Sequence, residues 1–522
     1  MELDLESQAR LVDGLFRLLN EQGSDSDAEL IETHISWVLL SGKFAYKIKK
    51  SLNLGFVDFS TLARRHFCCQ EELRLNRRLA PDVYLDVIAI TGTIELPLFS
   101  GSGEIIEYCV KMRRFSQEGL LSHHPKLITE RLVASLAGDV AGFHADIDRA
   151  GPQLEYGSPE RIIRPVLENF EQIQTLLDDS TLEDLLSELR RWTVSRFQLL
   201  RGTMERRKSE GFVRECHGDL HLGNIALEAD RLIIFDGIEF NPDLRWVDTM
   251  SELAFLLMDI EEKGSSRLSW RLLDSYLEIT GDYRGLEMLN FYIVYRAMVR
   301  AKVSSLRSAQ SDTSEAERRA LAADVHRYLE TAQKHTHAQA VALLITHGLS
   351  ASGKSTYCRQ LLEQLPAVRL RSDVERKRLA GLKPDDRSHS PPGGGIYLQG
   401  NTRETYDRLL DLSRSLLRCG YNVIIDAAFL DRRQRERFRL LAAQLAVPFL
   451  ILDFQVPESE LKTRVLKRQR ENKDPSEAGI EVLEKQLQNW KPLSADERRC
   501  SLPVTMSHQP SSEEVLALLK LK

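Results

Sequence analysis

The first 120 residues alternate between apolar and polar positions in a pattern typical of a small antiparallel sheet. The runs HISWVLL and KFAYKIKK are joined by Ser41 and Gly42, which predicts a β-hairpin. The runs VYLDVIAIT and IIEYCVKMRRF predict further strands, and FCCQEELRLNRRLA between the two pairs has apolar residues at helical spacing. Residues 127–150 and 176–204 are mostly helical in pattern. A small sheet is therefore expected to precede a helical lobe.

The pattern changes near residue 335. Residues 304–340 are polar, charged and rich in alanine, and they contain no evident core strand. Beyond them, VALLI, YNVIIDAAF and FLILDFQV are apolar runs that alternate with helical segments, as in a parallel α/β sheet. We expect one domain over residues 1–335 and a second over residues 336–522. SPPGGGIY, at residues 390–397, predicts a flexible loop at the edge of a site.

Composition narrows the class of protein. The chain has 522 residues, of which 42% are hydrophobic and 28% charged, as in ordinary globular proteins. A net charge of -6 argues against a general polyanion binder, although a local basic patch could still hold nucleic acid. The start, MELDLESQARLVDGLF, is acidic, and no apolar run approaches the ~18 residues that span a membrane. We expect a cytoplasmic protein without a membrane partner.

A glycine-rich loop opens the second expected domain. GLSASGKST, from Gly348 to Thr356, follows the apolar run VALLI and precedes a helical segment. Such a turn presents backbone N–H groups to a phosphate chain, while its lysine reaches the β and γ phosphates and its serine holds Mg²⁺. The residues expected to bind the nucleotide are Gly348, Ser350, Ser352, Gly353, Lys354, Ser355 and Thr356.

Two acidic positions follow this loop in the chain. Asp426 ends an apolar strand, where a carboxylate would bind Mg²⁺ together with Ser355; its alternative role is to cap a helix. Asp373 and Arg376 are one helical turn apart in RSDVERKR. A carboxylate there could accept a hydroxyl proton while the arginine holds a substrate phosphate, or the two could form a plain surface ion pair.

The first expected domain carries a different signature. Asp219 and Asn224 lie in HGDLHLGN, which has the spacing H-x-D-x-x-x-x-N, and Asp236 follows the apolar strand LIIF. Phosphoryl transfer of the protein-kinase type needs a base that orients the acceptor hydroxyl and two metal ligands at such positions. We therefore expect Asp219 to be catalytic and Asn224 and Asp236 to hold Mg²⁺, with His217 orienting the loop.

Both signatures resemble known families. In the second domain, the glycine-rich loop, Ser372 to Arg376, the polar helix from Thr402 to Leu409, the strand that ends at Asp426 and the run RVLKRQRENKDPSEA resemble the polynucleotide-kinase and zeta-toxin branch of P-loop kinases. This resemblance implies that Arg464, Arg468 and Arg470 form a lid over ATP; a solvated basic helix is the alternative.

HGDLHLGN is similar to HGDLHPGN of the aminoglycoside phosphotransferases, with Leu222 in place of proline. This resemblance implies a two-lobed kinase-like α+β domain in which Lys47 binds ATP and Glu72 is its ion-pair partner, with Lys49 and Glu71 as alternatives. It also suggests EYCVKM, residues 107–112, as an adenine-binding hinge, unless this run is an ordinary strand. The hairpin before Lys47 departs from the pattern, because it lacks a glycine-rich loop.

Together the two halves resemble a bifunctional aminoglycoside phosphotransferase and ATP-binding protein family. The resemblance implies an ATP- and Mg²⁺-dependent kinase with two nucleotide sites and unidentified hydroxyl-bearing acceptors. Two alternatives stay open from the sequence. The kinase-like half could be an inactive or regulatory lobe that controls the P-loop half, or the chain could use ATP to drive a conformational switch.

Overall fold

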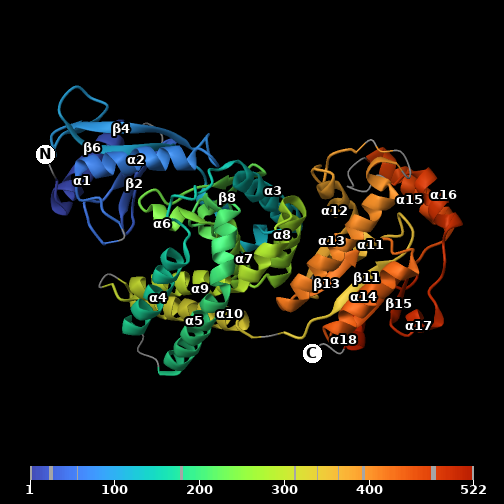
Figure 1. Cartoon of the computed structure of the whole chain (residues 1–522). Coiled ribbons are helices and arrows are strands. Elements are labelled where there is room, and N and C mark those ends of the chain that lie inside the picture. Colours follow the sequence, from blue (N-terminus) through green and yellow to red (C-terminus); the bar gives the residue numbers. More distant parts are fainter. Residues whose placement is uncertain are drawn as a thin grey trace. The chain divides into compact units, whose positions relative to one another are not determined.

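The computed structural model describes residues 3–22, 28–55, 57–176, 180–310, 313–337, 339–362, 364–388, 390, 394–471 and 478–519. These residues form two compact units (Figure 1). The first unit contains residues 1–128, 142–259 and 295–329, and the second contains residues 129–141, 260–294 and 330–522. Of the expected loop SPPGGGIY, residues 391–393 lie outside the described residues, and Gly395–Tyr397 form a short 3-10 helix. The division of the sequence after residue 335 stays a prediction about domains.

A six-stranded antiparallel sheet with the order β1-β2-β3-β6-β4-β5 begins the first unit. Its strands are β1 (Glu29–Glu32), β2 (Ser36–Ser41), β3 (Phe44–Lys49), β4 (Tyr84–Gly92), β5 (Pro97–Phe99) and β6 (Ile105–Arg113). The expected hairpin is confirmed, since β2 pairs with β3 up to Ser41 opposite Phe44. Gly42 has a φ of 52° in the two-residue turn between them, a left-handed conformation that glycine adopts readily.

Two helices cover the two faces of this sheet. Successive strand residues point to opposite faces, so Cys109 and Val110 of β6 belong to different core clusters. Helix α1 (Leu5–Gln22) packs with the cluster of Cys109, and helix α2 (Leu62–Asn76) packs with the cluster of Val110. Figure 1 shows α2 along β4 and β6 in the blue part of the chain. Side chains of β3 and α2 meet on this face of the sheet, where Lys47 contacts Glu72.

The run EYCVKM is a central strand and not a hinge. Residues Cys109 to Met112 of β6 pair with β3 on one side and with β4 on the other. Their backbone N–H and C=O groups are already used by the sheet, so they cannot pair with an adenine base. The hinge hypothesis for residues 107–112 is therefore wrong, and the alternative of an ordinary strand is confirmed.

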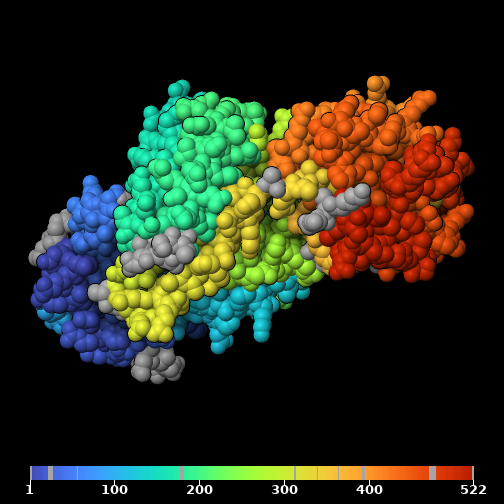
Figure 2. Space-filling view, turned by 90° about the horizontal axis from the view of Figure 1, so that it is seen from below, coloured from blue at the N-terminus to red at the C-terminus, as the bar shows by residue number. Residues whose placement is uncertain are grey.

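The rest of the first half is mostly helical. The helices are α3 (Glu130–Asp146), α4 (Pro159–Leu176), α5 (Ser180–Ser209), α6 (Pro242–Arg245), α7 (Thr249–Glu262), α8 (Ser266–Thr280), α9 (Leu286–Ser308) and α10 (Glu315–Lys334). Two short antiparallel pairs accompany them: β7 (Val213–Glu215) with β10 (Trp246–Asp248), and the hairpin of β8 (Ile225–Glu228) and β9 (Arg231–Ile234). Most side chains of α10 are exposed, and yellow atoms of this part of the chain lie on the face seen in Figure 2.

A five-stranded parallel sheet with the order β12-β13-β11-β14-β15 forms the core of the second unit, which confirms the expected α/β fold. Its strands are β11 (Leu343–His347), β12 (Ala367–Arg371), β13 (Asn422–Asp426), β14 (Phe449–Gln455) and β15 (Ser501–Thr505). Every residue of β11, β12 and β13 is buried, as expected for a sheet covered on both faces.

The helices after β11 are α11 (Lys354–Leu361), α12 (Ser372–Leu379), α13 (Gln399–Arg418), α14 (Arg432–Gln444), α15 (Glu458–Glu471), α16 (Ile480–Gln488), α17 (Ala495–Arg498) and α18 (Ser512–Leu519). Leu344, Ile424 and Leu452 share one core cluster with residues of α11 and α18. Figure 1 shows α11, α13 and α14 beside the strands of this sheet. Among the described residues, no helix combines the length and the apolar character that crossing a bilayer requires.

Candidate functional site

Asp219, the expected catalytic residue of the first unit, lies in a loop that is held by its own side chains. Asn224 Nδ2 donates hydrogen bonds to the carbonyl oxygen of Asp219 at 2.9 Å and to its Oδ2 at 3.1 Å. His221 Nε2 lies 3.3 Å from the same Oδ2. The structure therefore brings Asp219 and Asn224 together, with His221 as a third member.

The surroundings of Asp219 keep it ionised. Burial by itself would raise the pKa of this carboxyl group, but the charge and hydrogen bond of His221 oppose that effect. Arg300 adds further attraction, and the pKa of Asp219 falls below its usual range. Asp219 is therefore a carboxylate at neutral pH, which can accept a hydrogen bond from an acceptor hydroxyl.

Helix α7 holds this loop at two points on either side of Asp219. Glu252 Oε1 accepts a hydrogen bond from the N–H of Gly218 at 2.7 Å, and Asp259 Oδ2 accepts one from the N–H of Leu222 at 2.8 Å. Both carboxylates are buried. The sequence analysis missed them, although two acidic residues seven positions apart in the apolar run SELAFLLMD were a visible signal.

His217 connects the loop with the strand before Asp236. Its Nδ1 accepts a hydrogen bond from the N–H of Asp219 at 3.3 Å, and its Nε2 lies 2.9 Å from the carbonyl oxygen of Phe235. Burial lowers the pKa of His217, so the neutral imidazole is favoured. This geometry agrees with the expected orienting role of His217.

The expected metal ligand Asp236 follows β9 in an uncommon backbone conformation. Its φ is 63°, in the left-handed region that non-glycine residues seldom adopt. Two hydrogen bonds hold this turn: the N–H of Asp236 donates to Tyr84 Oη at 3.1 Å, and the N–H of Gly237 donates to Asn76 Oδ1 at 2.7 Å. Strain of this kind recurs at functional sites. Its carboxylate is 46% exposed and can therefore accept a ligand from solution.

Lys47 and Lys49 of β3 have different surroundings. Lys47 Nζ lies 2.9 Å from Glu72 Oε1 and 2.5 Å from Asp236 Oδ1. Lys49 is buried, and its Nζ contacts Glu72 Oε2 at 2.6 Å and the carboxylate of Glu239. Of the two alternatives, only Lys47 reaches the expected metal ligand. Glu239 was missed, and no signal in the sequence identified it.

Glu72 is the shared anion of the two lysines. Burial alone would raise the pKa of this carboxyl group, but Lys47 and Lys49 lower it to about 2. The alternative partner Glu71 instead pairs with Arg74, with 2.8 Å between Glu71 Oε1 and Arg74 Nε. The geometry therefore selects Glu72 over Glu71 as the anion beside Lys47; ATP binding by these residues stays a prediction.

The glycine-rich loop of the second unit connects β11 to α11. A Cβ at Gly348 would lie 2.8 Å from the Cβ of Phe454, so only glycine fits there. Gly353 has a φ of 94° and is the N-cap of α11. Lys354 Nζ donates to the carbonyl oxygens of Gly348 at 3.1 Å and Leu349 at 2.7 Å, and burial lowers its pKa. The side chain of Lys354 therefore lies across the glycine-rich loop, where we expect the phosphates of ATP to bind.

Asp426 fits a divalent cation. It ends β13, and its Oδ2 is buried and accepts no hydrogen bond from any residue that the structure describes, an arrangement that a cation would satisfy. The helix-cap alternative is wrong, because the next helix, α14, is capped by Asp431, whose Oδ1 accepts a hydrogen bond from the N–H of Arg433. β13 pairs with β11, and the N–H of Gly348 donates to the carbonyl oxygen of Ala428 at 3.1 Å, so Asp426 lies near the start of the glycine-rich loop.

Asp373 and Arg376 lie on one face of α12, as their spacing predicted. Asp373 Oδ1 and Arg376 Nη1 are 3.3 Å apart, and the guanidinium of Arg376 lies over the ring of Tyr397 at 5.1 Å. Arg376 Nε is buried and has no hydrogen-bond partner among the described residues. The ion pair does not by itself distinguish an acceptor site from a structural contact.

The expected lid arginines differ in what they contact. Arg468 Nη2 donates to Ser350 Oγ of the glycine-rich loop at 3.1 Å and to the carbonyl oxygen of Ala478 at 2.5 Å. Arg464 Nε donates to Glu460 Oε1 at 2.6 Å, and its Nη1 lies 3.6 Å from a Cβ built on Gly353. Both arginines therefore lie at the phosphate loop. The side chain of Arg470 lies outside the described residues.

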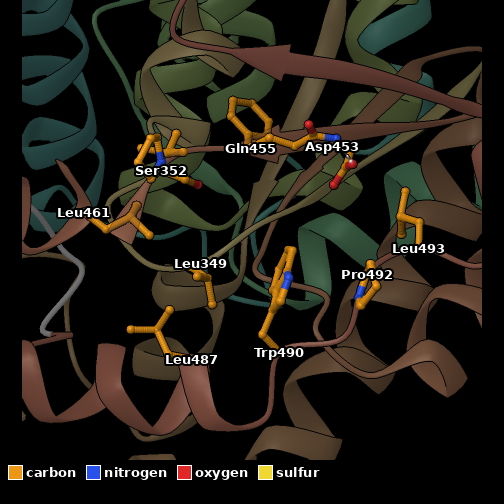
Figure 3. Close-up of a pocket in the computed structure, with 12 residues that line it drawn as sticks. Leu349, Ser352, Asp453, Gln455, Leu461, Leu487, Trp490, Pro492 and Leu493 are labelled. Atoms are coloured by element: carbon orange, nitrogen blue, oxygen red, sulfur yellow. Dashed lines mark hydrogen bonds between the residues drawn. The ribbon is translucent and has the colours of Figure 1, made fainter. Parts of the chain in front are cut away.

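A cavity of about 480 Å³ adjoins the phosphate loop (Figure 3). Leu349 and Ser352 of the loop line it together with Leu461, Leu487 and Trp490. The indole of Trp490 stacks on the buried ring of His347, with 4.6 Å between ring centroids. His347 Nδ1 in turn lies 2.6 Å from Asp453 Oδ1. The sequence analysis missed this cavity, because its walls come from segments far apart in the chain.

Comparison with known proteins agrees with this geometry. Residues 343–493 match the AAA domain family. The match begins at the first residue of β11 and includes the phosphate loop, Asp373, Asp426 and Trp490. The second unit therefore contains an AAA domain of the P-loop type.

A relative extends the similarity beyond this domain. The uncharacterized protein Rv2004c of Mycobacterium tuberculosis is 29% identical over 465 residues, which cover 88% of this chain and 90% of the relative. An alignment of that length extends into both halves of the chain.

Solved structures of two kinases also match parts of this chain. The amicoumacin kinase hAmiN, in complex with AMP-PNP, Ca²⁺ and Ami, is 11% identical with a TM-score of 0.40; it covers 62% of this chain and 95% of its own. A sugar kinase from Janibacter sp. HTCC2649 is 17% identical with a TM-score of 0.28; it covers 35% of this chain and 95% of its own.

Proposed function

We propose that this protein is an ATP- and Mg²⁺-dependent phosphotransferase with two nucleotide sites, one in each half of the chain. The observation that carries the proposal is the second site. There a phosphate loop with Lys354 lies near Asp426, whose buried Oδ2 has no donor, inside a segment that matches the AAA domain family. The domains proposed for the two sites are residues 1–335 and 336–522.

In the second site, the backbone of the loop from Gly348 to Thr356 and Lys354 would hold the phosphates of ATP. Ser355 and Asp426 would hold Mg²⁺, which neutralises charge on the transferred phosphoryl group. Asp373 would accept the proton of an acceptor hydroxyl, and Arg376 would bind an anionic group of that acceptor. Arg464 and Arg468 would close over the nucleotide from α15.

The cavity beside the loop supports a place for the adenine base. It is bounded by Leu349, Leu461 and Leu487, and Trp490 offers a flat aromatic face (Figure 3). Flat apolar walls of this kind favour a planar ring, which stacks on indole. We therefore propose that the adenine base of ATP binds in this cavity.

In the first site, Asp219 would orient and deprotonate the acceptor hydroxyl, and Asn224 and Asp236 would hold Mg²⁺. Lys47, paired with Glu72, would contact the phosphates of ATP. Lys47 also contacts Asp236, so its charge is shared between the two carboxylates when no nucleotide is bound. The acceptor of each site is a hydroxyl compound of unspecified class.

A single-turnover assay with γ-labelled ATP tests the proposal on the full chain. We expect Lys354→Ala and Asp219→Ala each to remove one part of the transfer to a set of alcohol-bearing metabolites and 5′-hydroxyl oligonucleotides. General-base removal lowers a rate by roughly 10²–10⁴-fold, which such an assay resolves. Transfer that survives in both single variants and in the double variant would refute the assignment of these sites.

A regulatory first unit is the second candidate function. The turn between β2 and β3 has only Gly42, and residues 33–35 between β1 and β2 contain no glycine, so no glycine-rich loop covers a phosphate chain there. If only Lys354→Ala abolishes transfer and Asp219→Ala leaves it unchanged, the first unit binds a ligand without catalysis.

A further inference from the structure

Helix α8 is joined to the edge strand of the parallel sheet by buried ion pairs. Asp274 accepts from Arg369, with 3.1 Å between Oδ1 and Nε and 2.7 Å between Oδ2 and Nη2. Glu278 accepts from Arg369 Nη2 at 2.8 Å and from Arg371 Nη1 at 2.6 Å. Asp274 and Glu278 are four residues apart and so lie on one face of α8. Both halves of these pairs belong to the second unit.

The same two arginines flank Asp426. Arg371 is the register partner of Asp426 in the β12–β13 ladder. Arg371 Nε is 3.6 Å from Asp426 Oδ2, and Arg369 Nη1 is 3.9 Å from it. Both distances exceed those of hydrogen bonds, and within the described part of the chain Asp426 Oδ2 has no donor. Arg369 Nη1 is likewise buried and has no acceptor among the described residues.

This arrangement is unusual for its chemistry. An arginine beside a buried carboxylate ordinarily closes on it, because charge-assisted hydrogen bonds are about 2.7–2.9 Å long and strong. Here α8 supplies two competing carboxylates, and the arginines bind them instead. The result is a carboxylate oxygen that is flanked by Arg369 and Arg371 yet accepts a hydrogen bond from neither of them.

We propose that Asp274 and Glu278 are positioning residues of the second site: they hold Arg369 and Arg371 away from Asp426 and so keep its Oδ2 available for a divalent cation. The inference rests on the proposed role of Asp426 as a metal ligand. It assigns part of the P-loop site to α8, which precedes the phosphate loop by about 70 residues of sequence and lies outside residues 343–493 that match the AAA domain family.

The test is a Mg²⁺ titration of the full-length protein at a fixed ADP concentration, in which calorimetry measures binding. The same titration of a Lys354→Met background measures the part of the signal that does not come from the phosphate loop. In Glu278→Gln, Arg371 loses its charged partner and can bind Asp426. We expect the Mg²⁺ concentration at half-saturation to rise on the order of tenfold.

A second substitution separates positioning from simple destabilisation. Adding Arg371→Met to Glu278→Gln removes the arginine that would block Asp426, so the Mg²⁺ midpoint should return to within about twofold of the parent value. A merely structural role of Glu278 predicts no such rescue. The matched control is Glu497→Gln, which breaks another buried arginine–glutamate pair, with Arg435, and should leave the midpoint unchanged.

Two outcomes overturn the inference: an unchanged midpoint in Glu278→Gln, or a raised midpoint that Arg371→Met does not restore. If Glu278→Gln does not fold, Asp274→Asn with Arg369→Met as its rescue gives the same comparison. Asp426→Asn tells the two proposals apart. If Asp426→Asn leaves the midpoint unchanged, the proposed metal site is wrong; if it raises the midpoint while Glu278→Gln does not, only the role of α8 is wrong.

Discussion

Glu497, at the residue scale, links the stability of the second unit to pH. Its carboxylate accepts from Arg435 Nε at 2.6 Å and Nη2 at 3.1 Å, and from the N–H of Ser494 at 2.9 Å. Burial by itself would raise the pKa of Glu497, but these donors lower it to about 2. The folded state therefore stabilises the ionised carboxylate of Glu497 relative to the unfolded chain.

The consequence is a loss of stability in acid. Because the pKa of Glu497 is lower in the folded state, its contribution is complete above pH ~4.5 and disappears as the pH falls toward ~2. We expect Glu497→Gln to lower the free energy of unfolding at pH 7 by about 2–3 kcal/mol and to flatten its dependence on pH below 4.5. Urea unfolding at several pH values measures both. Glu513→Gln, at an exposed position of α18, is the control, and an equal acid sensitivity of both variants would contradict the prediction.

The two lysines of β3 show what residue-level reasoning can decide. Lys47 and Lys49 have the same facing on one strand, and the sequence analysis left both open. The structure distinguishes them by their partners: Lys47 contacts Asp236, 189 positions away, and Lys49 is enclosed by Glu72 and Glu239. The motif spacing predicted Asp219, Asn224 and Asp236 as site residues, because they are near one another in the sequence; their catalytic and metal-binding roles stay predictions.

Helix α7 carries a prediction at the scale of elements. Asp259→Leu removes the acceptor of the Leu222 N–H and leaves that donor buried, which costs about 1–3 kcal/mol locally. We expect turnover at the first site to fall by about tenfold, with little change in nucleotide affinity, because the loop that orients Asp219 loosens. Glu261→Gln on the same helix, whose carboxylate binds His335, is the control. A rise in KM for ATP without a fall in kcat would contradict this role.

The cavity beside the phosphate loop carries a second prediction at this scale. Trp490→Ala removes the aromatic wall, and we expect the Kd of the second site for ATP to rise about tenfold, since stacking of a base contributes roughly 1–3 kcal/mol. Trp490→Phe should retain most of the affinity. Calorimetry measures the Kd, with Trp270→Phe in α8 as the control for the loss of an indole elsewhere. An unchanged Kd in Trp490→Ala would place the base outside this cavity.

At the scale of the whole molecule, two sites predict two bound nucleotides. We expect calorimetry with Mg·ADP to give a stoichiometry of about two for the parent chain, one for Lys354→Met, one for Lys47→Met and none for the double variant. Each bound nucleotide should also raise the unfolding temperature separately. A stoichiometry of one in the parent that only Lys354→Met removes would favour a first unit without nucleotide.

The three-dimensional structure also shows which segments of the chain pack around the parallel sheet, which the order of the residues does not reveal. The parallel sheet was expected from residue 336 onward, and β11, β13 and β14 are where the apolar runs predicted them. The edge strands β12 and β15 were not predicted. The compact unit around that sheet, however, also includes residues 129–141 and 260–294. Arg369 and Asp274, 95 positions apart, form a buried ion pair within it. A boundary drawn from composition could not detect such a contact.

The sequence by itself predicted several of the core strands and helices, the glycine-rich loop and the HGDLHLGN motif, because hydrophobic periodicity and motif spacing depend on residues that are neighbours in the chain. Only the tertiary structure decided that Lys47 rather than Lys49 reaches Asp236, that Glu252 and Asp259 hold the HGDLHLGN loop, and that the strand at residues 107–112 has its place between β3 and β4. The physical reason is that buried charges and backbone donors must find partners in three dimensions. Those partners came from segments that the linear pattern does not connect.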